Sequence, residues 1–298
     1  MRLGVSKKMI AIYTPTYNRA TELKKLYTSL IEQIDQNFFW LVIDDGSTDE
    51  TENLINEWIN DSKITIQYIK KENGGKHSAI NLALDIVDDY WNMCIDSDDW
   101  LLDRKSVYRI NEDICKWKKM ESINSIVYPY KFDYQEFDYN NRNYAVIKDF
   151  DFRNKRKNIL EATIVSRPGS YKGIRFPMFT GEKFIAESAI EIPKLYNSKA
   201  IYISNPVVEG HYLEDGLSNN IVKLWSQNPV GYYFVRNLGV DYYKNNRLYI
   251  KTLKPLGQMI AFNIYMKQPL LNCIKNKGLG IVSIPFGIIY WLKKFKNV

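Results

Sequence analysis

The stretch WNMCIDSDDWLLD, Trp91–Asp103, decides the fold class because a run of apolar residues ends abruptly within it. Trp91–Ile95 has the composition of a buried strand, and the acidic run Asp96–Asp99 follows it directly. Like charges packed this closely repel one another and resist burial. We therefore expect the acidic run to lie at the end of a strand, where its carboxylates can hold a partner of opposite charge.

Segments typical of strands and of helices alternate upstream of this stretch. The expected strands are Met9–Thr16, Phe38–Ile43 and Ile64–Ile69, and the expected helices are Thr21–Gln33, Glu50–Ile59 and Lys76–Val87. Ser47 or Thr48 is the expected N-cap of the second helix. Alternation at this interval predicts right-handed βαβ units and a largely parallel sheet.

A polar cluster follows each of the four expected strands. The clusters are Thr14–Arg19, Asp44–Asp49, Asn73–His77 and Asp96–Asp99. In sheets of this kind, ligands bind outside the carboxyl ends of the strands. The sequence therefore predicts one binding site along one edge of the sheet.

The second half of the chain is less regular. We expect strands over Ser125–Phe132, Ala162–Ser166 and Ile201–Val208, a helix over Phe184–Tyr196, and a helical, aromatic-rich region from Ile221 onward. The predicted organisation is a tail at 1–8 (with Met9 as an alternative start), an α/β domain with a mixed central sheet at 9–220, and a helical extension at 221–298.

The basic residues are concentrated at the C-terminal end. Ten of the 41 Lys and Arg residues lie in Tyr242–Val298, which has no Asp or Glu, so the first 241 residues hold 31 basic and 34 acidic side chains. A basic tail on an acidic body favours contact with a membrane surface over nucleic acid. The apolar run Gly278–Leu292 is shorter than the roughly 20 residues of a membrane span, which leaves an interfacial anchor and a buried C-terminal helix as equal alternatives.

The cysteines and the N-terminus bear on the compartment. Cys94, Cys115 and Cys273 are widely spaced and form no CxxC pair, which argues against a disulfide framework or a zinc site. The N-terminal residues lack the apolar segment of a signal peptide. We expect a cytoplasmic protein at the inner face of the cell membrane.

Asp96 and Asp98 carry the sharpest chemical signal. Two carboxylates at i and i+2 can converge on one hard cation such as Mg²⁺ or Mn²⁺, which neutralises charge on a departing diphosphate. An isolated DxD tripeptide is often a solvated turn, but its position after an apolar strand favours a metal site. Asn73–Lys76 fails as a Walker loop because Lys70 and His77 occupy positions that need Gly and Ser or Thr. A Gly-Gly turn entering a helix with a lysine still suits an anionic group.

Four motifs together carry a family resemblance: PTYNR at 15–19, VIDDGSTD at 42–49, NGGK at 73–76 and IDSDD at 95–99. In this order and spacing they resemble the nucleotide-sugar domain of glycosyltransferase family 2, which has the Rossmann-like GT-A fold. The resemblance implies inverting, metal-dependent transfer of a sugar, with 9–103 as the donor half and 104–220 as the acceptor half. The implied donor-binding residues are Thr14, Pro15, Tyr17, Arg19, Asp44, Asp45, Lys76, Asp96, Ser97 and Asp98.

The resemblance also directs attention to residues beyond the acidic run. The family's general base is a carboxylate near a helix start, for which Glu187 is preferred by a small margin over Glu182. His211 is a candidate third metal ligand, beside Asp96 and Asp98. Asp99 and Trp100 are candidate acceptor contacts; a turn residue and a core aromatic are the alternatives.

The predicted function is transfer from a nucleotide diphosphate sugar, expected to be a UDP-sugar, to a hydroxyl of a glycan or lipid-linked acceptor in cell-surface polysaccharide synthesis. Mn²⁺ or Mg²⁺ is the expected cofactor, and no nucleic-acid partner is expected. Two alternatives remain. A sugar-nucleotide nucleotidyltransferase needs a Gly-rich, Arg-containing loop after the first strand, which PTYNR is not. A catalytically silent nucleotide- or glycan-binding module is the other.

Overall fold

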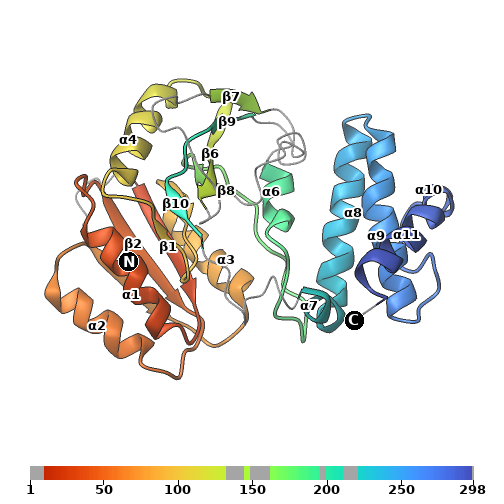
Figure 1. Ribbon diagram of the computed structural model, residues 1–298, viewed down its shortest axis with the longest axis horizontal. Coiled ribbons are helices and arrows are strands. Elements are labelled where there is room, and N and C mark those ends of the chain that lie inside the picture. Colours follow the sequence, from red (N-terminus) through yellow and green to blue (C-terminus); the bar gives the residue numbers. More distant parts are fainter. Residues whose placement is uncertain (1–9, 132–143, 148–161, 195–198, 211–220, 297–298) are drawn as a thin grey trace. The chain divides into compact units, whose positions relative to one another are not determined.

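A computed structural model of the chain describes residues 10–131, 144–147, 162–194, 199–210 and 221–296 (Figure 1). The expected tail at 1–8 and His211 lie outside these residues. The chain divides into two compact units, Met1–Arg175 with Asn197–Leu213, and Phe176–Tyr196 with Glu214–Val298. Residues 176–196 therefore group with the C-terminal helices, although they precede position 220 in the chain.

The first unit is built on a mixed, ten-stranded sheet. Its first part has the order β3-β2-β1-β4, in which all neighbours are parallel. These strands are β1 (Ile10–Thr16), β2 (Phe38–Asp44), β3 (Ile66–Lys70) and β4 (Trp91–Cys94). The helices between them are α1 (Ala20–Ile31), α2 (Thr51–Asp61) and α3 (Lys76–Val87). The predicted strand-helix alternation is confirmed, and the four polar clusters follow strands that run in one direction.

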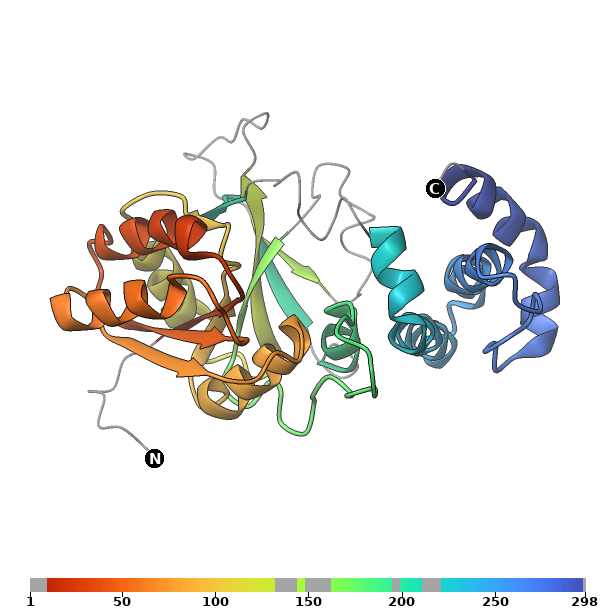
Figure 2. The same ribbon diagram turned by 90° about the horizontal axis from the view of Figure 1, so that it is seen from below.

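Both faces of this parallel sheet are covered, which explains why its strands are apolar on both sides. Ile10 and Ile12 of β1 pack in one core with side chains of α1, α2 and α4 (Ser106–Trp117). Helix α3 covers the opposite face (Figure 2). The intervening strand residues, such as Ala11, are fully buried as well.

The sheet continues beyond β4 with antiparallel and parallel partners. These are β8 (Ala162–Ser166), β6 (Ile123–Lys131), β10 (Val208–Glu209) and β5 (Trp100–Leu101), while β9 (Lys199–Ile203) pairs with β6 and with β7 (Tyr144–Ile147). The prediction of a single strand over Ile201–Val208 is wrong. Pro206 has no N–H for a ladder, and two short strands flank it instead.

The second unit is helical and its core is aromatic. It contains α6 (Ser188–Lys194), α7 (Ile221–Gln227), α8 (Pro229–Asn245), the 3₁₀ helix η1 (Tyr249–Thr252), α9 (Leu253–Tyr265), α10 (Lys277–Val282) and α11 (Ile284–Lys294). The rings of Tyr232 and Phe262 lie 4.2 Å apart at its centre, with Tyr233 and Phe295 beside Phe262. No helix among the described residues is long and apolar enough to cross a membrane.

Two glycines bring α9 and α11 into close contact. A Cβ added at Gly257 would lie 3.2 Å from the backbone nitrogen of Gly287, and one added at Gly287 would lie 2.6 Å from Cβ of Ile260. The two helices therefore approach more closely than a side chain at position 287 would permit. This contact fixes which face of α11 points inward.

The predicted helix over Phe184–Tyr196 is shorter in the structure. Its first residues are not helical because the N–H groups of Lys183 and Phe184 donate to Oδ1 of Asn228, at 2.7 and 3.0 Å. The N-cap prediction for α2 is also wrong. The residue before this helix is Glu50, and Ser47 instead accepts a hydrogen bond from the N–H of Asn18 at 2.9 Å.

Candidate functional site

Asn18 joins the first two strand-end loops. Its backbone N–H donates to Oγ of Ser47, and its side-chain oxygen accepts from the N–H of Thr48 at 2.8 Å. Asn18 has a φ of 51°, in the left-handed region that Asn tolerates better than most residues. The loop after β1 is therefore held against the loop after β2.

Asp44 and Asp45 are both buried at the end of β2, where they do different work. Asp44 accepts from the N–H of Ser47 at 2.7 Å and from the hydroxyl of Tyr68 at 2.6 Å. Burial and the bond to Asp44 raise the pKa of Tyr68 above its ordinary value. Asp44 thus holds the turn after β2, with one carboxylate oxygen on each partner.

Asp45 joins the second loop to the third. Oδ1 accepts from the N–H of Gly74 at 3.0 Å, and Oδ2 accepts from the N–H of Gly75 at 2.7 Å. Gly75 has a φ of 89°, a conformation that side chains rarely adopt. By accepting from two successive N–H groups, the Asp45 carboxylate fixes the backbone conformation of the turn that leads into α3.

Lys71 is a component of this loop that sequence reasoning missed. Its ammonium lies 2.6 Å from Oδ1 of Asp45 and 2.8 Å from Oγ of Ser78. The Lys71 side chain is 23% exposed, so this ion pair is better shielded from water than a surface pair. Only the spacing of a lysine between β3 and the Gly-Gly turn offered a signal, and that spacing alone is common.

Lys76 joins the third loop to the fourth. Its ammonium lies 2.7 Å from Oδ2 of Asp96, across the start of α3 and the end of β4. The four clusters are thereby linked in series, the first to the second by Asn18, the second to the third by Asp45, and the third to the fourth by Lys76.

The carboxylates of Asp96, Asp98 and Asp99 converge, with one oxygen from each lying within 4.8 Å of the others. Burial, and after it the charge of Asp96, raise the pKa of the Asp98 carboxyl above its usual range, while Lys76 and Arg19 oppose the shift. Because like charges repel at such distances, the fold holds these groups together at a cost. Three oxygen donors of this kind suit a hard divalent cation.

Thr14 and Pro15 lie inside the sheet rather than on its edge. Thr14 is fully buried, and its hydroxyl accepts a hydrogen bond from the indole N–H of Trp40 at 3.0 Å. Pro15 is also buried and is aligned with Ile43 of β2. Both residues position the strand end from which the first loop leaves.

Tyr17 and Arg19 are on the surface of the first loop. Tyr17 is 48% exposed, so its ring is available to stack on a ligand. The Arg19 guanidinium lies 3.0 Å from the carboxylate of Glu22. Its positive charge partly opposes the rise in the pKa of Asp98. Ser97, between the two aspartates, is buried.

Asp99, the last residue of the acidic cluster, is followed directly by Trp100. Asp99 is 7% exposed, and its N–H donates to the carbonyl of Asp96 at 3.1 Å, as in a tight turn. The Lys25 ammonium lies 3.1 Å above the Trp100 ring, which is a cation–π arrangement. Trp100 is half-buried in β5, so at least one ring face is already used.

Glu182 and Glu187 belong to the second unit, where they differ in environment. The carboxylate of Glu182 accepts from the N–H groups of Val230 and Gly231, at 2.7 and 2.8 Å. These are orphan donors in the first turn of α8, so Glu182 caps that helix. Glu187 is exposed and directly precedes α6.

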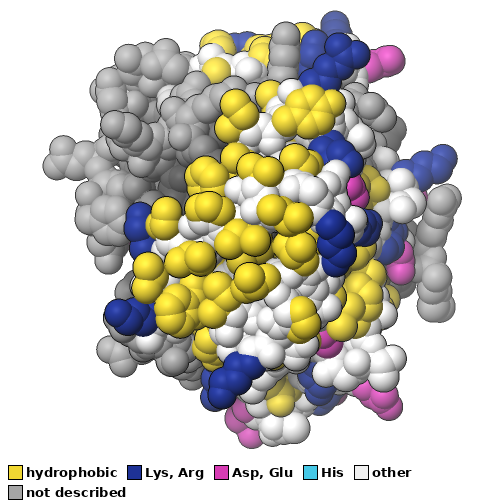
Figure 3. Space-filling view, turned by 90° about the vertical axis from the view of Figure 1, so that its right-hand side faces the viewer, with side chains coloured by type: hydrophobic (Ala, Val, Ile, Leu, Met, Phe, Trp, Pro, Cys, Tyr) yellow, Lys and Arg dark blue, Asp and Glu magenta, His cyan; other side chains and the backbone are white. Residues whose placement is uncertain are grey.

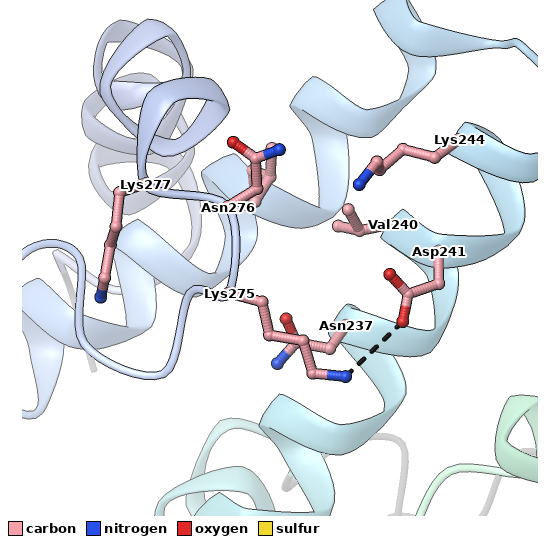
Figure 4. A pocket seen from close by; sticks show the side chains of 8 residues that line it. Asn237, Val240, Asp241, Lys244, Lys275, Asn276 and Lys277 are labelled. Carbon is pink, nitrogen blue, oxygen red and sulfur yellow. Dashed lines mark ion pairs between the residues drawn. The ribbon is translucent and has the colours of Figure 1, made fainter.

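A separate shallow pocket of about 400 Å³ lies within the second unit, between α8 and the segment that leads into α10 (Figure 4). Lys275 reaches Asp241 across it at 3.6 Å, and the Lys244 amine points toward the segment that carries Asn276. Lys277 donates to the carbonyl of Leu271 at 2.6 Å. Three lysines against one aspartate make this pocket basic.

The sequence profile described as glycosyl transferase family 2 matches residues 11–180. An uncharacterized glycosyltransferase of Mycoplasma genitalium, MG060, is 25% identical over 236 residues, which cover 77% of this chain and 70% of that protein. Glycosyltransferase GlyA of Streptococcus pneumoniae is 34% identical over 92 residues, and a teichoic acid poly(glycerol phosphate) polymerase of Staphylococcus epidermidis is 33% identical over 93 residues. Each of these two alignments covers 31% of this chain and 13% of the relative.

Solved structures with the same fold include S. aureus TarS 1-349 in complex with UDP-GlcNAc, with a TM-score of 0.61 and 13% identity, covering 93% of this chain and 80% of that one. The mannosyltransferase PcManGT of Pyrobaculum calidifontis, in complex with GDP-Man and Mn²⁺, has a TM-score of 0.54 and 14% identity, covering 95% and 88%. The predicted fold, a mixed GT-A sheet followed by a helical region, is confirmed.

Proposed function

The chain belongs to glycosyl transferase family 2, and we propose that it transfers a sugar with inversion from a UDP-sugar to a hydroxyl of a glycan or lipid-linked acceptor. The observation that carries this proposal is the convergence of Asp96, Asp98 and Asp99 beside the ammonium of Lys76. Acidic groups that can hold a cation, next to a basic group at a helix N-terminus, are what a nucleoside diphosphate requires.

The donor lies along the edge formed by the four linked loops. Tyr17 supplies an exposed ring for the base, and Arg19 and Lys76 supply positive charge for the phosphates. Asp44 and Asp45 keep these loops in place through bonds to Ser47, Gly74 and Gly75. Their contribution to donor binding is therefore chiefly positional.

The acidic cluster fits a divalent cation. Its donor set is oxygen only, which Mg²⁺ and Mn²⁺ prefer. The pKa of Asp98 is raised by burial and, after it, by the charge of Asp96, and a bound cation would oppose both effects. Asp96 and Asp98 would hold the ion, with Asp99 within reach and His211 as a further candidate. A cation bound there neutralises the charge that develops on the departing diphosphate.

The general base is Glu187. Inversion needs a group that takes the proton of the acceptor hydroxyl as the oxygen attacks the sugar. Both oxygens of Glu182 already accept backbone N–H groups of α8, so protonating Glu182 would weaken the cap of that helix. Glu187, the other carboxylate of this segment, is exposed and lies directly before α6.

The acceptor belongs to cell-surface polysaccharide synthesis, at the inner face of the cell membrane. Matching segments of a teichoic acid polymerase and of other glycosyltransferases favour a glycan or lipid-linked acceptor. Asp99 and Trp100, directly after Asp98 in the chain, are the residues that we propose contact it.

The decisive experiment measures release of UDP from a panel of UDP-sugars, with Mn²⁺, with Mg²⁺ and with a chelator. Slow release that requires the cation is the expected outcome, and a suitable acceptor should accelerate it. Formation of a UDP-sugar from UTP and a sugar phosphate would instead identify a nucleotidyltransferase. Tight UDP-sugar binding without turnover, with any acceptor, would identify a silent binding module.

A further inference from the structure

An unusual surface lies on the C-terminal helices α10 and α11. Six large apolar side chains of these helices are between 45% and 59% exposed: Ile281, Val282, Phe286, Ile288, Ile289 and Leu292. Figure 3 shows hydrophobic side chains gathered in a broad band on this side of the molecule. A contiguous apolar patch on a folded protein marks a binding surface more often than a solvated face.

The orientation of α11 explains why this face is outward. Ser283 and Gly287 are buried, and Gly287 packs against Gly257 of α9. Because residues three and four apart share a helix face, Ile289 and Leu292 lie on the side away from Gly287. Phe286 flanks the contact with Gly257 but is still half exposed beside them. A surface helix normally presents polar residues to solvent, whereas α11 presents apolar ones.

Positive charge flanks this apolar band in the sequence. Exposed lysines lie before it at Lys275 and Lys277 and after it at Lys293 and Lys294. Figure 3 shows Lys and Arg side chains at its margins. The whole segment Tyr242–Val298 has ten basic residues and no acidic one. An anionic surface is therefore the electrostatic complement of this face, and a second copy of the same face would repel it.

We propose that the apolar face of α10 and α11 binds the surface of a lipid bilayer that contains anionic lipids. The apolar side chains enter the boundary between headgroups and acyl chains, and the lysines at both ends of the band contact lipid phosphates. Helix α11 has 11 residues and is about 16 Å long, so it lies along the bilayer surface and does not cross it. This inference does not depend on the proposed sugar transfer.

The test is flotation of the full chain with vesicles of phosphatidylcholine alone, or with about 30% phosphatidylglycerol added. The wild type should bind the anionic vesicles at least about tenfold more tightly than the neutral ones, and high salt should weaken this binding. The double substitution Phe286→Ser/Ile289→Ser should reduce binding at least about tenfold. Lys293→Gln/Lys294→Gln should reduce it by about fivefold per lysine on anionic vesicles only.

Ile34→Ser is the matched control, because Ile34 is 54% exposed but lies in the first unit. It should leave vesicle binding unchanged. All substituted side chains are exposed, so thermal unfolding and UDP binding should be unchanged in every variant. Equal binding to both vesicle types, or full binding by Phe286→Ser/Ile289→Ser, would overturn the proposal. A dimer in light scattering that this variant abolishes, without vesicle binding by the wild type, would assign the face to a second copy.

Discussion

The ammonium of Lys76 lies 2.7 Å from Oδ2 of Asp96, joining the start of α3 to the end of β4. Both side chains are about one-third exposed, so the pair itself adds little to stability. We expect Lys76→Met to weaken UDP binding by about tenfold or more through loss of a phosphate contact, with little change in unfolding. Calorimetric titration measures the first quantity and urea unfolding the second.

Lys70→Met is a matched control for this substitution. Lys70 forms an ion pair with Glu52, also at 2.7 Å, but is outside the proposed donor set. UDP binding that falls equally in both variants would contradict a specific role for Lys76.

Asp98→Asn should slow cation-dependent UDP release by about 100-fold or more. A bound cation of this kind lowers the activation barrier by several kcal/mol. The metal-free variant should be as stable as the wild type at pH 7, or more stable. In the wild type the pKa of Asp98 is raised, so the ionised carboxylate destabilises the folded state. This loss of stability grows as the pH rises from the ordinary pKa of Asp through the raised one. Asn removes the penalty.

Glu57→Gln removes the same charge from the exposed side of α2 and is the control for Asp98→Asn. It should retain full activity. Wild-type rates in Asp98→Asn, measured with saturating Mn²⁺, would remove Asp98 from the cation site.

Substitutions at Glu182 and Glu187 should have different effects, the first on stability and the second on turnover. Glu182→Ala removes the acceptor of two N–H groups in α8, and we expect a loss of about 1 kcal/mol in the free energy of unfolding. Glu187→Gln should lose turnover while UDP-sugar binding and the melting temperature stay unchanged. If Glu182→Gln is the inactive but stable variant, the assignment of the base is reversed.

Gly287→Ala should destabilise the second unit by about 1–3 kcal/mol, because the added methyl group would lie 2.6 Å from Cβ of Ile260. Gly239→Ala is the control within α8. An added Cβ there has its nearest neighbour at 4.0 Å, so alanine should stabilise that helix by up to about 1 kcal/mol. Denaturant unfolding of both variants measures the difference; equal effects would argue against the close approach of α9 and α11.

Alkaline pH should unfold the second unit through buried tyrosines. Burial raises the pKa of Tyr232 to about 12, and its hydroxyl donates to the carbonyl of Gln258 at 3.0 Å. Between pH 10 and 12 the unfolded chain loses this proton and the folded chain keeps it, so stability falls as pH rises. The raised pKa of Tyr232 alone should lower the free energy of unfolding by about 1 kcal/mol at pH 11.

Urea unfolding at pH 8 to 11 measures this dependence. Tyr232→Phe should flatten it in part, since burial also raises the pKa of Tyr233. An unchanged slope in Tyr232→Phe would show that another group controls alkaline unfolding.

Local patterns were sufficient to predict much of the first unit. Helix α3 begins at Lys76 and ends at Val87 as predicted, because the Gly-Gly turn and the apolar spacing both lie within that segment. The same is true of β8, which is Ala162–Ser166 as predicted. The parallel direction of β1 to β4 was also predicted, from their alternation with helices.

Contacts between distant segments account for what the sequence did not reveal. Lys71 has its role because Asp45, 26 residues earlier, arrives beside it. Glu182 is a helix cap because α8 begins 47 residues later, at Pro229. Strand β5, Trp100–Leu101, exists through its pairing with Val208–Glu209. No periodicity within these segments carries such information.

The serial linkage of the four loops has a consequence for donor selectivity. Since Asn18, Asp45 and Lys76 already bind protein groups, the edge of the sheet is ordered before any nucleotide arrives. A ligand then loses little affinity to the entropy of ordering loops. Such a preformed edge would bind the nucleotide part of every UDP-sugar with the same affinity. If the proposed donor binds there, discrimination between sugars would come from side chains beyond this network, which can change without disturbing the four linked loops.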